Sequence, residues 1–155
     1  MKALLVIDVQ DVYLKRYKDL SFIDSINRKI NDAKQNGECI IYIQNVGPFK
    51  SNGPEYKFCD GLNIVSDTMF VKKKPNAFAN SALLTYLRNG NIDELELVGI
   101  DGAICVYHTA KGAIDNGFTV SIDTACVAAV SAKRYSHRID ELKDLGVRIE
   151  SYGQY

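Results

Sequence analysis

Three kinds of side chain that support covalent catalysis stand just after apolar segments of this chain: Asp8, the run Lys72–Lys74, and Cys105. A thiolate can attack a carbonyl carbon, and a nearby carboxylate can take up and return the proton. A lysine ammonium group can hold both neighbours in their charged forms. If the fold brings the three together, the chemistry they support is acyl transfer through a covalent intermediate on the cysteine.

Cys105 is the most informative of the three because of its place in the local pattern. It begins a helical stretch after the apolar run Leu95–Ile100. Free N–H groups at a helix start favour a thiolate and can hold an oxyanion. Gly99 and Gly102 allow the intervening turn to take unusual backbone angles. The alternative is a buried cysteine that packs against the start of the helix. Local features alone support the two interpretations equally.

Asp8 and the lysines also have plainer interpretations. A carboxylate directly after four apolar residues is expected to be partly buried, although a capping or exposed loop aspartate fits the same pattern. For Lys72–Lys74 the alternative is a solvated basic patch, and at least two of the three are assigned to it. Cys39 and Cys126 lie in or beside apolar runs and are interpreted as small buried apolar residues.

Other known motifs fit this sequence poorly. Cys105 and Lys111 have the spacing of a tyrosine-phosphatase loop, but that chemistry needs the planar fork of an arginine. Neither a G-x-G-x-x-G nor a G-x-x-x-x-G-K-[ST] loop is present. His108 and His137 are isolated, and the four cysteines have no metal-ligand spacing. A flavodoxin-like phosphoacceptor domain ranks last, because the third strand leads into lysines where such domains place an aspartate.

The surrounding pattern alternates strands with helices. Short apolar runs predict strands at 4–7, 39–43, 69–71, 95–100, 118–122 and 147–149. Apolar residues at three- and four-residue steps predict helices from about 20 to 33, 80 to 88, 103 to 116 and 131 to 145. Gly37, Gly90 and Gly117, each preceded by asparagine, are expected to cap helices in the left-handed conformation. Residues 46–66 are expected to form a long loop beside the pocket.

This order of elements predicts an α/β fold: a three-layer α-β-α sandwich around a six-stranded, mostly parallel, Rossmann-like sheet, in one domain spanning residues 1–155. In such sheets ligands bind beyond the carboxyl ends of the strands, near a switch in strand order. Asp8, Lys72–Lys74 and Cys105 all follow predicted strands, so we expect them to meet at one edge.

Composition excludes several classes of partner. Nineteen basic residues balance nineteen acidic ones, which favours neither nucleic acid nor a membrane surface. No apolar stretch approaches the roughly 20 residues that span a bilayer. The apolar run at the amino terminus is short and ends in Asp8, so we interpret it as a strand, not a signal peptide, and expect a cytoplasmic protein.

Three segments in this order resemble the isochorismatase-like cysteine hydrolases, which include nicotinamidases and N-carbamoylsarcosine amidases. They are Leu5–Gln10, Lys72–Phe78, and Gly99–Ala110 with the glycines that follow. The resemblance covers residues 3 to about 130. It implies an Asp8, Lys72 and Cys105 triad, with Lys72 chosen because it lies six residues before Phe78 and with Lys74 as its rival. It also implies a cis peptide at Ile100–Asp101, leaving the N–H groups of Asp101 and Cys105 as the oxyanion hole.

The resemblance further implies a cysteine-dependent hydrolase that cleaves a C–N bond of a small amide or carbamoyl compound and acts as a homodimer or homotetramer. Metal-binding nicotinamidases carry an aspartate and histidines after the second strand, where this chain has Gln44 and Asn45. We therefore expect no metal or other cofactor, and nicotinamide is a disfavoured substrate. Gln10, Tyr13, Gln44 and Phe78 are the expected pocket residues. The alternative function is a catalytically silent relative that binds a small molecule or senses thiol oxidation.

Overall fold

The sheet is all parallel and has helices on both faces. The computed structural model describes residues 1–47 and 54–151, so part of the loop expected at 46–66 lies outside the described residues. The strands are β1 (Lys2–Ile7), β2 (Cys39–Asn45), β3 (Met69–Lys72), β4 (Glu94–Gly99), β5 (Thr119–Val127) and β6 (Arg148–Glu150). The helices are α1 (Asp11–Leu14), α2 (Phe22–Gln35), α3 (Ser81–Asn89), α4 (Cys105–Asp115) and α5 (Ala132–Asp144), with 3-10 turns at Pro54–Tyr56 and Ala77–Ala79.

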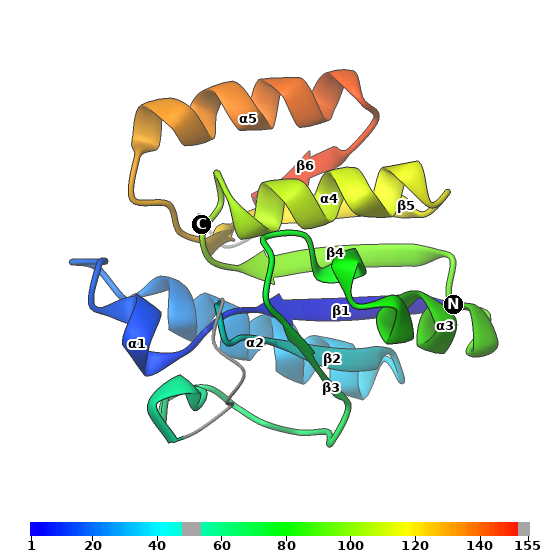
Figure 1. Ribbon diagram of the computed structural model, residues 1–155, viewed down its shortest axis with the longest axis horizontal. Coiled ribbons are helices and arrows are strands. Elements are labelled where there is room, and N and C mark those ends of the chain that lie inside the picture. Colours follow the sequence, from blue (N-terminus) through cyan, green and yellow to red (C-terminus); the bar gives the residue numbers. More distant parts are fainter. Residues whose placement is uncertain (48–53, 152–155) are drawn as a thin grey trace.

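The strand order β3-β2-β1-β4-β5-β6 contains one reversal of direction across the sheet. The chain first builds outward from β1 through β2 to β3, then returns to place β4 on the other side of β1 (Figure 1). Each neighbouring pair of strands is parallel. The switch point therefore lies between β1 and β4, and their carboxyl ends carry Asp8 and the turn that leads to Cys105.

The alternating side chains of β1 divide the core into two layers. Ala3, Leu5 and Ile7 pack against α3 and α4, whereas Leu4 and Val6 pack against α2 on the opposite face. All five are fully buried, as expected for a central strand covered on both faces. The predicted three-layer α/β architecture is thereby confirmed.

The glycine caps were predicted correctly at two of three places. Gly37 and Gly117 have φ angles of 70° and 87°. Gly90 was predicted wrongly, because its φ is −85° and the left-handed residue is Asn91, at 56°. Asparagine tolerates this conformation better than most residues with a side chain, so the turn after α3 is displaced by one position.

Candidate active site

Asp8 leaves β1 in an unusual backbone conformation. Its φ is 59°, in the left-handed region that few residues other than glycine and asparagine or aspartate adopt. Its N–H group still donates to the Ile43 carbonyl of the neighbouring strand, at 3.0 Å. The carboxylate is buried at the carboxyl end of the sheet.

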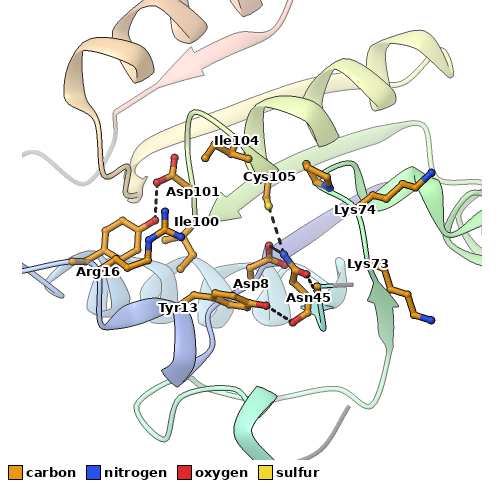
Figure 2. Close-up of a pocket in the computed structure, with 13 residues that line it drawn as sticks. Asp8, Tyr13, Arg16, Asn45, Lys73, Lys74, Ile100, Asp101, Ile104 and Cys105 are labelled. Atoms are coloured by element: carbon orange, nitrogen blue, oxygen red, sulfur yellow. Dashed lines mark hydrogen bonds between the residues drawn. The ribbon is translucent and has the colours of Figure 1, made fainter. Parts of the chain in front are cut away.

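Lys72 lies directly between Asp8 and Cys105. Its Nζ atom is 3.0 Å from Asp8 Oδ2 and 3.3 Å from Cys105 Sγ. The lysine and aspartate side chains are 1% and 3% exposed, and Cys105 is 8% exposed. Lys74 is exposed, and its ammonium group points away from the cysteine (Figure 2). The geometry thus selects Lys72 from the lysine run.

The pKa of the Cys105 thiol is higher than the sequence predicts. Burial, followed by the neighbouring Asp8 charge, raises the pKa of the Cys105 thiol to about 12, against the opposing effect of Lys72. The thiol of the free protein is therefore less acidic than its place at a helix start predicts. Burial also raises the pKa of Asp8, although Lys72 opposes this shift. At neutral pH the resting nucleophile is therefore a neutral thiol that lies beside Asp8 and Lys72.

Asn45, the last residue of β2, is a further member of the cluster. Its Nδ2 atom lies 3.4 Å from Asp8 Oδ2 and 3.9 Å from Cys105 Sγ, and its Oδ1 accepts from Gly47 N at 2.7 Å. Sequence reasoning placed Gln44 at the site instead. The alternation of side chains along β2 could have indicated Asn45. It lies on the same face of the strand as Ile41 and Ile43, which pack in the same core layer as Cys105.

The turn before α4 leaves two amide groups free. Ile100–Asp101 is a cis peptide bond, as the resemblance implied. In this turn the N–H groups of Gly102, Ala103, Ile104 and Val106 all donate to protein acceptors. Within residues 1–47 and 54–151, those of Asp101 and Cys105 have no such acceptor. Both are therefore available for a negatively charged oxygen.

The side chain of Asp101 stabilises the turn. Its Oδ1 accepts from Ala103 N at 2.8 Å, and its Oδ2 accepts from Val130 N and from the Tyr17 hydroxyl, both at 2.8 Å. The carboxylate therefore ties the end of β4 to the segment after β5 and to the segment after α1.

The residues that follow Lys72 in the chain contact α4 beyond Cys105. The N–H group of Ala77 donates to Thr109 Oγ1 of α4 at 3.0 Å. A side chain on Gly112 of α4 would lie within 2.6 Å of the Asn76 side chain, so glycine permits this close approach. Phe78 then stacks on Phe118, with ring centroids 5.9 Å apart. These contacts fix Lys72 relative to Cys105 and explain the spacing of the two motifs.

A cavity of about 210 Å³ lies over this cluster. The described residues that line it are Asp8, Tyr13, Arg16, Tyr17, Asn45, Gly47, Lys73, Lys74, Pro75, Ile100, Asp101, Ile104 and Cys105 (Figure 2). This volume is below the usual range for drug-sized ligands, which indicates a small ligand.

Of the four pocket residues expected from the sequence, only Tyr13 lines the cavity. Gln10 is fully buried and bonds to both the N–H and the carbonyl of Asn45. Gln44 donates to the Tyr56 carbonyl, and Phe78 packs against the core. Their placement in the pocket was wrong: the two glutamines satisfy buried backbone groups, and Phe78 fills an apolar layer.

The described residues at the carboxyl end of β2 do not fit a catalytic metal. In the described part of the chain, no group of three His, Cys, Asp or Glu side chains could hold a metal ion. Asn45 turns its N–H donors toward Asp8 and Cys105, and its oxygen already accepts from Gly47. No step at this site is therefore assigned to a metal.

Comparison with known proteins identifies the family. The family model described as "Isochorismatase domain" matches residues 2–152. The chain belongs to the isochorismatase family. A relative from Arabidopsis thaliana, named a probable inactive nicotinamidase, is 23% identical over 94% of this chain and 90% of its own length. The nicotinamidase/pyrazinamidase of Mycobacterium tuberculosis is 33% identical over 43% of this chain and 36% of its own length.

Solved structures of this isochorismatase fold superimpose closely on the chain. The pyrazinamidase of Pyrococcus horikoshii in complex with zinc has a TM-score of 0.89 at 20% identity, covering 97% of this chain and 99% of its own. The nicotinamidase of Staphylococcus aureus has a TM-score of 0.83 at 22% identity, with coverages of 97% and 98%. At these identities the likeness concerns the fold alone. Relatives named as nicotinamidases hydrolyse an amide, so the family includes amide hydrolases. Among the described helices, none is long and apolar enough to cross a membrane.

Proposed function

We propose that this chain is a cysteine hydrolase that cleaves the C–N bond of a small amide or carbamoyl compound through a thioester. The observation that carries the proposal is the buried contact of Lys72 with both Asp8 and Cys105 at the floor of a small cavity. Burial of a carboxylate and an ammonium group is costly unless they are paired, and enzymes use such arrangements to adjust protonation states.

In the first half-reaction, Asp8 accepts the thiol proton as Cys105 Sγ bonds to the carbonyl carbon of the substrate. Oδ1 of Asp8 has no hydrogen-bond partner within the described residues, so it has a lone pair for this proton. The oxyanion accepts hydrogen bonds from the N–H groups of Asp101 and Cys105. Asp8 then gives the proton to the nitrogen, the C–N bond breaks, and ammonia or an amine leaves.

In the second half-reaction, a water molecule attacks the thioester carbon and passes its proton to Asp8. The tetrahedral intermediate releases the sulfur, which recovers the proton from Asp8, and the acid product departs. Burial raises the pKa of Asp8, so its carboxylate is a stronger base than that of an exposed aspartate and takes up the thiol proton more readily. Lys72 keeps its charge throughout and stabilises whichever of the two neighbours is the anion.

The test is ammonia or amine release over a panel of small amides, ureides and carbamoyl compounds. Cys105→Ala is expected to lower the rate by at least about 10³-fold while circular dichroism and thermal unfolding stay unchanged. Cys39→Ala, at a half-buried cysteine far from the cavity in the fold, is the matched control and retains full activity. Full activity in Cys105→Ala would contradict the proposal.

The alternative function as a silent binding protein keeps one supporting observation, the name of the Arabidopsis relative. It predicts a ligand-induced thermal shift with no product from any amide in the panel. A thiol-sensing role is disfavoured, because redox-sensing cysteines are accessible and of low pKa, whereas Cys105 is buried and its thiol pKa is raised to about 12.

A further inference from the structure

The wall of the cavity carries an arginine that has no ion-pair partner among the described residues. Arg16 follows α1 by two residues, is exposed, and lines the same cavity as Cys105. Within the described ranges, no carboxylate lies within ion-pair distance of its guanidinium group. Arg16 lies near Ile100 and Asp101, on the side of the cavity formed by the turn before α4 (Figure 2).

The two carboxylates that line the cavity are already occupied. Asp8 is paired with Lys72. Asp101 accepts hydrogen bonds from two backbone N–H groups and from the Tyr17 hydroxyl. Lys73 and Lys74 also line the cavity, but their ammonium groups point outward (Figure 2). With Asp8 balanced by Lys72, the lining has three cations, Arg16, Lys73 and Lys74, against the single carboxylate of Asp101, so positive charge is in excess. Of these cations, Arg16 is the one placed to contact a ligand.

The other walls limit what such a ligand can be. Tyr13, Tyr17, Ile100 and Ile104 provide apolar surface around a volume of about 210 Å³. A guanidinium group binds a carboxylate through two parallel N–H···O bonds, which fixes orientation as well as charge. A short molecule with a carboxylate at one end and an amide at the other fits both Arg16 and the thiol.

We propose that Arg16 binds the carboxylate of an anionic amide substrate and thereby sets the substrate class of this enzyme. This inference rests on the proposed hydrolase function for its meaning, but its key contact is testable without turnover. The substrate class is a small monoanionic amide or carbamoyl acid, and its neutral analogues of the same shape are poor substrates.

The experiment compares alkylation of Cys105 by iodoacetate and by iodoacetamide, which are similar in size and differ in charge. In both reactions the sulfur bonds to the CH₂ carbon, iodide leaves, and the thiol proton passes to solvent. Peptide-level mass spectrometry measures the rate at Cys105 and, in the same sample, at Cys39. Cys39 is half-buried at the start of β2. Its two alkylation rates therefore give the ratio of the intrinsic reactivities of the two reagents.

We expect Arg16→Gln to lower the iodoacetate rate at Cys105 about tenfold, the equivalent of one bidentate charged contact. The iodoacetamide rate is expected to change less than about twofold. Lys74→Gln, which removes the same charge from an outward-pointing side chain, keeps the preference of the unaltered protein. The effect weakens at high salt, because the contact is partly exposed.

Equal loss of both rates in Arg16→Gln would overturn the proposal, and so would no change in either. An equal effect of Lys74→Gln would show that the general electrostatic field of the cavity, and not a contact with Arg16, sets the preference. That result also overturns the proposal. Absence of any Cys105 alkylation at pH 9 contradicts an open path from Arg16 to the sulfur. A companion assay with succinamate and succinamide separates the two proposals: no ammonia from either compound leaves the alkylation result intact, whereas equal turnover of both contradicts anion selection.

Discussion

Lys72 and Asp8 form a buried ion pair, with Nζ 3.0 Å from Oδ2, and the same nitrogen lies 3.3 Å from the sulfur of Cys105. One lysine side chain therefore contacts two acidic groups. In the proposed mechanism the carboxylate is the base for the thiol, and the pKa of Cys105 depends on the Asp8 charge.

Asp8→Asn is expected to make the thiol more acidic while it abolishes turnover. The Asp8 charge is one of the causes that raise the pKa of Cys105 to about 12, and its removal leaves Lys72 as the nearest charge. A lower thiol pKa increases the thiolate fraction tenfold for each pH unit, so iodoacetamide alkylation at pH 7 rises about tenfold or more. Thiolate absorbance against pH is the direct measurement, and an unchanged titration of Cys105 would contradict the assigned cause.

Lys72→Met and Lys74→Met separate the two lysines that sequence left as rivals. Lys72→Met leaves the buried Asp8 carboxylate without its ion-pair partner, which costs about 3–5 kcal/mol in the free energy of unfolding at neutral pH. Lys74→Met, at an exposed position, changes it by less than about 0.5 kcal/mol. Urea unfolding measures both, and similar losses in the two variants would be inconsistent with the assignment.

The pH dependence of Lys72→Met has a definite sign. Burial raises the pKa of Asp8 in the folded protein, and without Lys72 the opposing effect of the positive charge is lost. Protonation of Asp8 then favours the folded state, so the stability deficit shrinks as pH falls toward the unfolded aspartate pKa of about 3.9 and grows as pH rises. A deficit that widens in acid would contradict the buried carboxylate.

Asn45 is expected to act as a positioning residue. Asn45→Ala removes donors to both Asp8 and Cys105 and is expected to lower kcat about 10- to 100-fold with little change in KM. Asn45→Asp adds a second carboxylate beside Asp8, so the pKa of the Cys105 thiol rises further and the rate falls more. Titration of the Cys105 thiol distinguishes this electrostatic effect from simple loss of packing, which would shift the thiol pKa equally in both variants.

Gly99→Ala tests the turn that leads from β4 to the cysteine. The φ of Gly99 is 121°, and a Cβ atom there would lie 2.1 Å from the Ile7 carbonyl oxygen of β1. We expect a loss of about 3 kcal/mol or more in the free energy of unfolding. Gly61→Ala is the control, because a Cβ atom there has nothing within 4 Å, and its stability is expected to change by less than about 1 kcal/mol. Equal effects would contradict the close approach of β1 and β4.

Much of the fold was predictable because strands and helices differ in local periodicity. The run Leu4–Ile7 is continuous and apolar, and it became the central strand; the three- and four-residue steps through Ile26 and Ile30 became α2. Boundaries were less predictable. The fifth strand extends to Val127, beyond the predicted end at 122, because pairing with β4 continues past the apolar run.

Sequence by itself determined the chemical types at the site. Asp8, the lysine run and Cys105 follow strands that local pattern identifies, and parallel strands place their carboxyl ends at one edge. Strand alternation could not choose Lys72 over Lys74, because side chains two residues apart lie on the same face; only the resemblance favoured Lys72. The register decided it: Asn45 of β2 pairs with Lys72, which is the last residue of β3.

Tertiary structure alone decided the roles that depend on distance and burial. It separated Asn45 from Gln44, moved Phe78 from the pocket into the core, and placed Arg16 on the cavity wall. It also reversed the expected acidity of Cys105, because burial and the Asp8 charge together outweigh the opposing effect of Lys72. Local sequence specifies which groups are present, but their pKa values and partners depend on neighbours that are distant in the chain and close only after folding.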